Sequence, residues 1–122
     1  MAPYENSAKL LKALSHPTRL AILDLLRAGE ACVCHLEAAL GHRQAYISQH
    51  LMVLRDAGLV GDRREGSNVY YHVTRPQVYT VLDAANQSAV PELAEQSFSR
   101  LDQAAPCLVN CACPHCNPNK TL

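Results

Sequence analysis

The stretch Ile47-Ser48-Gln49-His50-Leu51-Met52-Val53-Leu54-Arg55-Asp56-Ala57-Gly58-Leu59-Val60 decides the fold of this 122-residue chain. Ile47, Leu51 and Leu54 recur at helical spacing, so the sequence predicts a helix over 44–57 that the following glycine closes. Polar side chains fill the first half of this helix, and glutamine is suited to paired hydrogen bonds with adenine. The stretch therefore indicates a helix that packs through one face and presents polar groups on another.

The residues before this helix predict the rest of a helix-turn-helix. Ser7 caps a first helix, Pro17 opens a second helix that Gly29 ends, and Gly41 stops a short third helix. The predicted ranges are 7–14, 17–28 and 34–40. A short helix joined by a tight glycine turn to a longer one is the arrangement in which the second helix enters the major groove of DNA.

From Leu59 onward the pattern changes from helix to strand. Residues 59–60 and 69–73 are mainly β-branched, aromatic or aliphatic, and the turn-forming residues 65–68 stand between them. This order predicts a two-stranded hairpin placed behind the helix-turn-helix, where it would form a wing.

The last third of the chain predicts helix and then irregular structure. Thr74 and Pro76 open a helix to about residue 88, and a further helix over 91–103 follows before three prolines exclude continuous helix. The predicted fold class is mainly α (α+β): a winged helix-turn-helix with a two-stranded wing, followed by a dimerisation helix and a Cys-rich tail. The predicted domains are 1–104 and a Cys/Pro-rich tail over 105–122.

Composition limits the classes of partner and compartment. The formal net charge is zero, with 11 basic and 11 acidic side chains, but residues 42–75 hold five arginines against three acids. This middle third is the basic part of the chain, as a nucleic-acid surface requires. No apolar run approaches the roughly 20 residues that span a bilayer, and the N-terminal residues carry charge where a signal peptide is apolar. We therefore predict a cytoplasmic protein that does not enter a membrane.

All six cysteines lie in two clusters, and none is scattered through the apolar stretches. They are Cys32 and Cys34, and in the tail Cys107, Cys111, Cys113 and Cys116. In a reducing compartment such clusters favour metal binding or thiol chemistry over structural disulfides. Thiolates prefer As(III), Cd(II), Pb(II), Cu(I) or Zn(II). Two cysteines at this spacing point about 200 degrees apart in a regular helix, so joint ligation requires that Cys32 precede the helix or that its first turn distort.

Four segments resemble the ArsR/SmtB family of metalloregulatory winged helix-turn-helix repressors over roughly residues 8–88. They are Ala13-Leu14-Ser15-His16-Pro17-Thr18-Arg19-Leu20-Ala21-Ile22-Leu23, Cys32-Val33-Cys34-His35-Leu36, the stretch from Ile47 to Val60, and Arg64-Glu65-Gly66-Ser67-Asn68-Val69-Tyr70-Tyr71. The resemblance implies a homodimer that sits on double-stranded operator DNA and leaves it when a metal or metalloid ion binds. It also implies that the chain is not an enzyme, and no nucleophile with a matching base is visible in the sequence.

The resemblance assigns residues to the DNA and dimer contacts. The implied base or phosphate contacts are Gln44, Tyr46, Ser48, Gln49 and His50, with Arg63 and Arg64 of the wing at phosphate or in the minor groove. For His50 a packing or phosphate role is favoured over metal ligation. The implied dimer contact places Leu10, Leu11 and Leu14 against Val78, Val81, Leu82 and Ala85.

The resemblance also bears on the ion site. The family's thiolate site is a Cys-Val-Cys followed by an acidic residue, and here His35 replaces the acid. The third cysteine of one arsenite-sensing branch falls at Glu37, and residues 1–31 hold no cysteine for the N-terminal ligands of the cadmium and lead branch. The implied metal ligands are therefore Cys32 and Cys34 with one or more tail cysteines, and As(III), Sb(III), Cd(II), Pb(II) or Zn(II) as inducer. The family's His and carboxylate site is not expected, because only Asp83 is available between 74 and 88.

Other interpretations of the cysteines stay open. The four tail cysteines alone could hold a structural zinc ion, since Cys113 and Cys116 have the two-residue spacing of a zinc knuckle. A thiol-based redox or persulfide sensor of the same fold would use Cys32 and Cys34 without an ion. A thiol oxidoreductase built on Cys113 and Cys116 would need a strand and a helix to position that motif, and the Pro-rich tail lacks them. A metal carrier without an operator would leave the wing unexplained.

Overall fold

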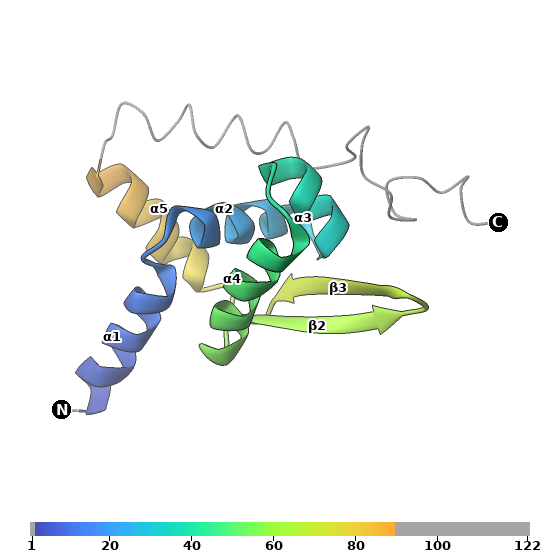
Figure 1. The fold of residues 1–122 in the computed structure, drawn as a ribbon. Helices are drawn as coiled ribbons and strands as arrows, with labels where there is room; N and C mark the ends of the chain where they lie inside the picture. Colours follow the sequence, from blue (N-terminus) through green and yellow to red (C-terminus); the bar gives the residue numbers. More distant parts are fainter. Residues whose placement is uncertain (1, 90–122) are drawn as a thin grey trace.

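The structure, a computed structural model, describes residues 2–89, which form helices and three short strands (Figure 1). In chain order the elements are α1 (Ala2–Leu14), α2 (Pro17–Leu25), the 3-10 helix η1 (Leu26–Ala28), β1 (Ala31–Cys32), α3 (Val33–Leu40), α4 (Gln44–Asp56), β2 (Val60–Glu65), β3 (Asn68–Val73) and α5 (Val78–Ala89). This order confirms the predicted winged helix-turn-helix. The predicted helix over 91–103, the domain boundary near 104 and the four tail cysteines lie outside the described residues.

The core lies where α2, α3 and α4 pack together. The side chains that are almost completely buried come from these helices and from the chain just after α4: Ile22, Leu23, Leu36, Ile47, Leu51, Leu54 and Leu59. The stripe predicted on α4 is thus the inward face of that helix, and its burial is the main force that holds α4 on the body of the protein.

A three-residue turn joins α3 to α4 and makes the helix-turn-helix. Gly41 ends α3 with φ +69°, in the left-handed region, and its N–H donates to the Glu37 carbonyl at 2.8 Å. Only glycine adopts this conformation at little cost, so the turn can be this short. The direction of α4 relative to α3 follows from this turn and the shared core.

The start of α1 differs from the prediction, whereas α2 begins at Pro17 as predicted. α1 begins at Ala2 instead of Ser7, and the Ser7 hydroxyl lies inside the helix, where it donates to the Pro3 carbonyl at 3.0 Å. Serine can form this bond one turn back, so its presence does not by itself mark a helix start. α2 is capped by the His16 ring, whose Nδ1 accepts from the Thr18 N–H at 3.1 Å. Within residues 2–89 no helix is long and apolar enough to cross a membrane.

The sheet has three strands where the sequence predicted two. β3 is the middle strand, β2 pairs with it to form the hairpin, and β1 adds an antiparallel edge through Ala31 and Cys32. A strand of two residues has no alternating pattern, so the sequence carried no signal for it. The hairpin of β2 and β3 projects from the helices as the wing (Figure 1).

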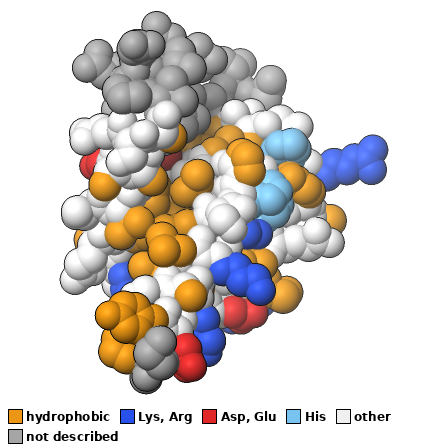
Figure 2. All heavy atoms as spheres, turned by 90° about the vertical axis from the view of Figure 1, so that its left-hand side faces the viewer, with side chains coloured by type: hydrophobic (Ala, Val, Ile, Leu, Met, Phe, Trp, Pro, Cys, Tyr) orange, Lys and Arg blue, Asp and Glu red, His pale blue; other side chains and the backbone are white. Residues whose placement is uncertain are grey.

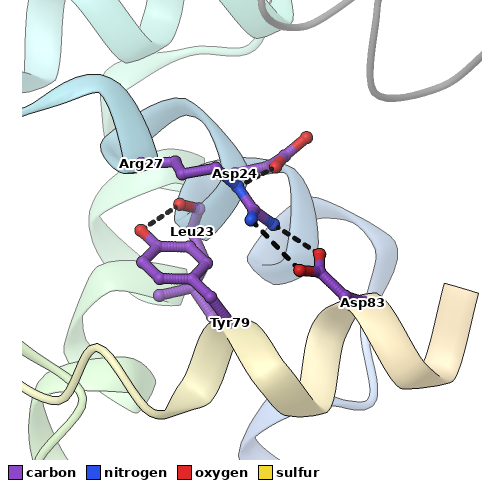
Figure 3. Close-up of polar contacts among 5 residues, drawn as sticks. All are labelled: Leu23, Asp24, Arg27, Tyr79 and Asp83. Atoms are coloured by element: carbon purple, nitrogen blue, oxygen red, sulfur yellow. Dashed lines mark hydrogen bonds and ion pairs between the residues drawn. The ribbon is translucent and has the colours of Figure 1, made fainter. Parts of the chain in front are cut away.

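A cluster of polar contacts attaches α5 to the end of α2 (Figure 3). Arg27 donates to Asp24 at 3.0 Å and to both carboxylate oxygens of Asp83 at 2.9 and 3.4 Å, and its guanidinium lies 4.4 Å from the centre of the Tyr79 ring. Burial raises the pKa of Tyr79 to about 12, so its hydroxyl stays protonated and donates to the Leu23 carbonyl at 2.7 Å. Asp83 is thereby engaged in holding α5 in place.

Candidate nucleic-acid interface and cysteine site

The outward face of α4 carries most of the polar residues predicted to contact DNA. Gln44 and Gln49 are exposed and Ser48 is partly exposed. Ala45 and Met52 share this face, and Met52 is 63% exposed. Neither of these two was predicted, although their helical spacing from Gln49 on the side opposite Ile47 and Leu51 could have indicated them. The face is open along the length of the helix that a major groove would cover.

Tyr46 and His50 lie at the edge of α4 that meets α2. The Tyr46 side chain is 36% exposed and its hydroxyl lies 3.3 Å from the Thr18 hydroxyl, while His50 is only 9% exposed. The His50 ring centre is 4.2 Å from that of His16 and 4.7 Å from that of Tyr46. The His50 ring therefore packs between helices and does not share the outward face with Gln44 and Gln49, and its contact with DNA stays a prediction. Its buried position agrees with the packing role favoured above.

The contacts of His50 require a neutral imidazole. Arg19 Nη1 lies 3.3 Å from His50 Nδ1, and because a guanidinium only donates, Nδ1 must accept. Burial lowers the pKa of His50, and the nearby His16, Arg19 and His42 lower it further. His16 likewise uses Nδ1 as the acceptor that caps α2. Acid therefore removes the acceptor at His50 and adds positive charge where α2 meets α4.

We expect acid to destabilise the fold through His50. Its pKa is lower in the folded than in the unfolded chain, so the unfolded state binds more protons and the free energy of unfolding falls as pH drops below about 6.5. The stability is complete above that pH and is lost as pH falls through the folded pKa. Urea unfolding midpoints between pH 7.5 and 5.0 measure the effect. His50→Gln, which keeps an acceptor for Arg19, should show a shallower decline, and an equal decline would contradict the assignment.

The two wing arginines differ in their surroundings. Arg63 donates to Glu30 through Nε at 3.1 Å and through Nη2, and to Glu65 at 2.9 Å; these bonds, Glu30 first, raise the pKa of Arg63. Arg64 is exposed and forms no ion pair with any residue in the described range. Successive side chains of a strand point to opposite faces, so the two arginines leave the wing on different sides. Arg43, exposed beside the start of α4, is a further cation that the prediction omitted.

Cys32 and Cys34 lie together at the start of α3. Cys32 precedes the helix in extended conformation, with ψ 163°, and its sulfur accepts from the His35 N–H at 3.4 Å as the N-cap. This placement meets the requirement that Cys32 lie outside the helix. The two residues form a disulfide with a Cα–Cα distance of 5.4 Å, and Cys32 is 2% exposed.

The disulfide shows that the side chains of Cys32 and Cys34 point toward each other, so that their sulfurs lie side by side. In reduced form they would offer two thiolates to one ion, next to the backbone N–H groups of a helix start, which favour the thiolate form. Among residues 2–89 no group of three or more His, Cys, Asp or Glu side chains is arranged to hold a metal.

Comparisons with known proteins point to one family. A profile described as "Bacterial regulatory protein, arsR family" matches residues 16–61. An uncharacterized HTH-type transcriptional regulator of Methanocaldococcus jannaschii is 38% identical over 88 residues, covering 71% of this chain and 99% of that protein. The arsenical resistance operon repressor of Escherichia coli is 46% identical over 67 residues, 54% of this chain and 57% of its own length.

A solved structure agrees with these sequence matches. It is the homodimeric winged helix-turn-helix DNA-binding domain of a possible ArsR-family transcriptional regulator from Mycobacterium bovis. The TM-score is 0.65 at 35% identity, and the match covers 72% of this chain and 82% of that one. The described part of this chain thus has the winged helix-turn-helix fold of that domain.

Proposed function

Since this chain belongs to the arsR family of bacterial regulatory proteins and has the family's winged helix-turn-helix fold, we propose that it is a metal-responsive repressor. It binds operator DNA as a homodimer and is released when a thiophilic ion binds the thiolates of Cys32 and Cys34. As(III) or Sb(III), Cd(II), Pb(II) and Zn(II) are the candidate ions, and one or more of the tail cysteines complete the site. The arsenical resistance repressor of Escherichia coli among the relatives supports an ion of this class.

The observation that carries this proposal is the position of the cysteine pair. Cys32 caps α3, the first helix of the helix-turn-helix, and Cys34 lies in its first turn. Cys32 also belongs to β1, which pairs with the wing strand β3. A ligand that draws the two sulfurs together acts on both DNA-binding elements at once. Ion binding can change DNA affinity only if the two states differ in such contacts.

DNA recognition is assigned to the outward face of α4 and to the wing. Gln44, Ser48, Gln49 and Tyr46 contact base edges or phosphates in the major groove, while Arg64 reaches a phosphate. We expect Gln49→Ala to weaken specific binding by about 1–3 kcal/mol and to relax sequence preference at one position. Arg64→Ala should weaken binding to all sequences and reduce the salt slope by about 1. Fluorescence anisotropy at several salt concentrations distinguishes the loss of a base contact from the loss of a phosphate contact. A changed salt slope in Gln49→Ala would contradict the assignment of Gln49 to a base edge.

The homodimer is assigned to the face that carries α1 and α5. Figure 2 views the molecule from the left-hand side of Figure 1 and shows hydrophobic side chains spread over this face. Leu14, Val78 and Leu82, which the family resemblance placed in the dimer contact, are buried in the core of the single chain. Of the expected contact residues, Leu11 has 54% of its surface exposed, and Ala85 is exposed as well. Tyr4 of α1, which is 71% exposed, is also open to a partner. The homodimeric relative from Mycobacterium bovis supports this assembly.

The test of the proposal is release from DNA. Arsenite, Cd(II), Pb(II) and Zn(II) are titrated into reduced full-length protein on fluorescent DNA, and release at near-stoichiometric ion that a chelator or dithiol reverses is the expected result. No release by any of these ions would contradict a metal-responsive repressor.

A second function is supported by the disulfide itself. Two thiols can lose two protons and two electrons to an oxidant such as peroxide and become the Cys32–Cys34 disulfide, in which case oxidation would be the signal. Release from the same DNA is measured with peroxide and with polysulfide at the same salt concentration, and the result distinguishes an ion sensor from an oxidation sensor. Release by oxidant alone, reversed by reductant, would assign the cysteines to a redox or persulfide sensor.

A further inference from the structure

Cys32, Tyr70 and Arg63 lie in one row across the sheet. Tyr70 of the middle strand pairs with Cys32 of β1 on one side and with Arg63 of β2 on the other. Side chains of directly paired residues point to the same face. Cys32 and Tyr70 are both buried and pack together with Cys34 and Ala38, so the tyrosine contacts the cysteine site on one side and the wing arginine on the other.

Glu30 adds a second connection between the cysteine site and the wing. It stands two residues before Cys32, and both of its carboxylate oxygens accept from Arg63. The Arg63 guanidinium also lies 4.9 Å from the centre of the Tyr70 ring. The segment from Glu30 to Cys32 thus holds one wing cation through a side-chain ion pair and through the row of paired strands.

The wing is in turn linked to α4. The neighbouring row of the sheet is Ala31, Tyr71 and Asp62, and the Asp62 carboxylate lies 3.5 Å from Nη1 of Arg55 in the last turn of α4. Both side chains of this pair are at least partly exposed, so it contributes little energy. The connection from the cysteines to Arg63 has more contacts: the strand pairing of Cys32, Tyr70 and Arg63, the contact of the guanidinium with the Tyr70 ring, and the Glu30 pair.

We propose that the wing transmits the state of the cysteine pair to DNA, with Glu30 and Arg63 as positioning residues. This inference rests on the proposed function and names the element through which it acts. With the disulfide present, Glu30 and Glu65 pair with Arg63 and keep it from neutralising a phosphate. In the reduced, ion-free protein β1 shifts, Glu30 releases Arg63, and the guanidinium pairs with DNA. Each phosphate that is no longer neutralised lowers the salt slope by about 0.9, so this one residue changes affinity appreciably.

Glu30→Gln tests the connection, and Glu65→Gln is its matched control. Glu65 also pairs with Arg63 but belongs to the same hairpin, so it moves with the arginine and does not report on the cysteines. The measured quantity is the ratio of DNA dissociation constants with and without Cd(II), with arsenite and diamide as parallel samples of full-length protein. We expect this ratio to fall at least threefold in Glu30→Gln and to stay at the wild-type value in Glu65→Gln. Adding Glu30→Gln to Arg63→Gln should cause no further fall, because the two residues act as one unit.

A second measurement does not depend on DNA. Amide signals of Tyr70 and Tyr71 and the Nε–H signal of Arg63 are compared by NMR between diamide-oxidised and dithiothreitol-reduced protein. We expect all three to shift in the wild type, and unchanged wing signals would overturn the inference. If no ion or oxidant changes DNA affinity, the proposed function is wrong, and the NMR signals alone then decide whether the cysteine pair is coupled to the wing. If the wild type is released but Glu30→Gln and Glu65→Gln give equal ratios, the proposed function stands and the inference is wrong.

Discussion

Cys32→Ser and Cys34→Ser are expected to bind DNA as tightly as the wild type and to lose the response to ions. Coupling between two sites is typically 5- to 150-fold in affinity, and in each variant we expect the change on adding arsenite, Cd(II) or Pb(II) to stay within about twofold. Each variant leaves one thiolate at α3, too few to hold the ion. Anisotropy on the same DNA, with and without ion, measures the effect.

Serine is a matched replacement at this place. At position 32 its hydroxyl can accept from the His35 N–H as the Cys32 sulfur does, and serine is a preferred N-cap, so α3 should begin as before. Cys116→Ser in the tail serves as a comparison that keeps both cysteines at α3. If Cys32→Ser or Cys34→Ser fails to bind DNA without ion, the pair is structural and the proposal is wrong. Release of both variants at the wild-type ion concentration would equally contradict it.

Leu51→Ala is expected to lower the free energy of unfolding by about 2–5 kcal/mol. Leu51 is 1% exposed on the inward face of α4, and truncation removes apolar contacts and leaves a cavity. For a domain of this size each kcal/mol lowers the melting temperature by about 4–8 °C, so a fall of at least about 8 °C is expected. Thermal unfolding is followed by circular dichroism at one fixed protein concentration, because a dimer's stability depends on concentration.

Met52→Ala is the control for this measurement. Met52 follows Leu51 directly on the same helix but is 63% exposed, so its truncation should change the free energy of unfolding by no more than about 0.5 kcal/mol. A similar fall in both variants would mean that the orientation of α4 on the core is wrong. Such a result would also remove the basis for assigning its outward face to DNA.

Local patterns determined the helices, the turn and the hairpin. The spacing of Ile47, Leu51 and Leu54 predicted α4, and Gly41 predicted the turn before it, because helical periodicity and a left-handed glycine are properties of neighbouring residues. The residue order around Cys32 and Cys34 likewise predicted that they could act together only if Cys32 preceded the helix, as it does. The start of α1 was predicted five residues late, since a serine inside a helix resembles a cap.

Contacts between distant residues were decided only by the tertiary structure. His50 is buried because α4 packs on α2, where Arg19 and His16, more than 30 residues away, meet its ring. Arg63 is paired because β1 brings Glu30 to the wing, and β1 forms only where β3 offers it an edge. Sequence by itself determined the helices and the hairpin of this protein and where its cysteines cluster, because those signals are periodic or local. The packing of those elements decided which polar side chains face outward and which are engaged, since burial and ion pairing depend on residues that the chain brings together only after it folds.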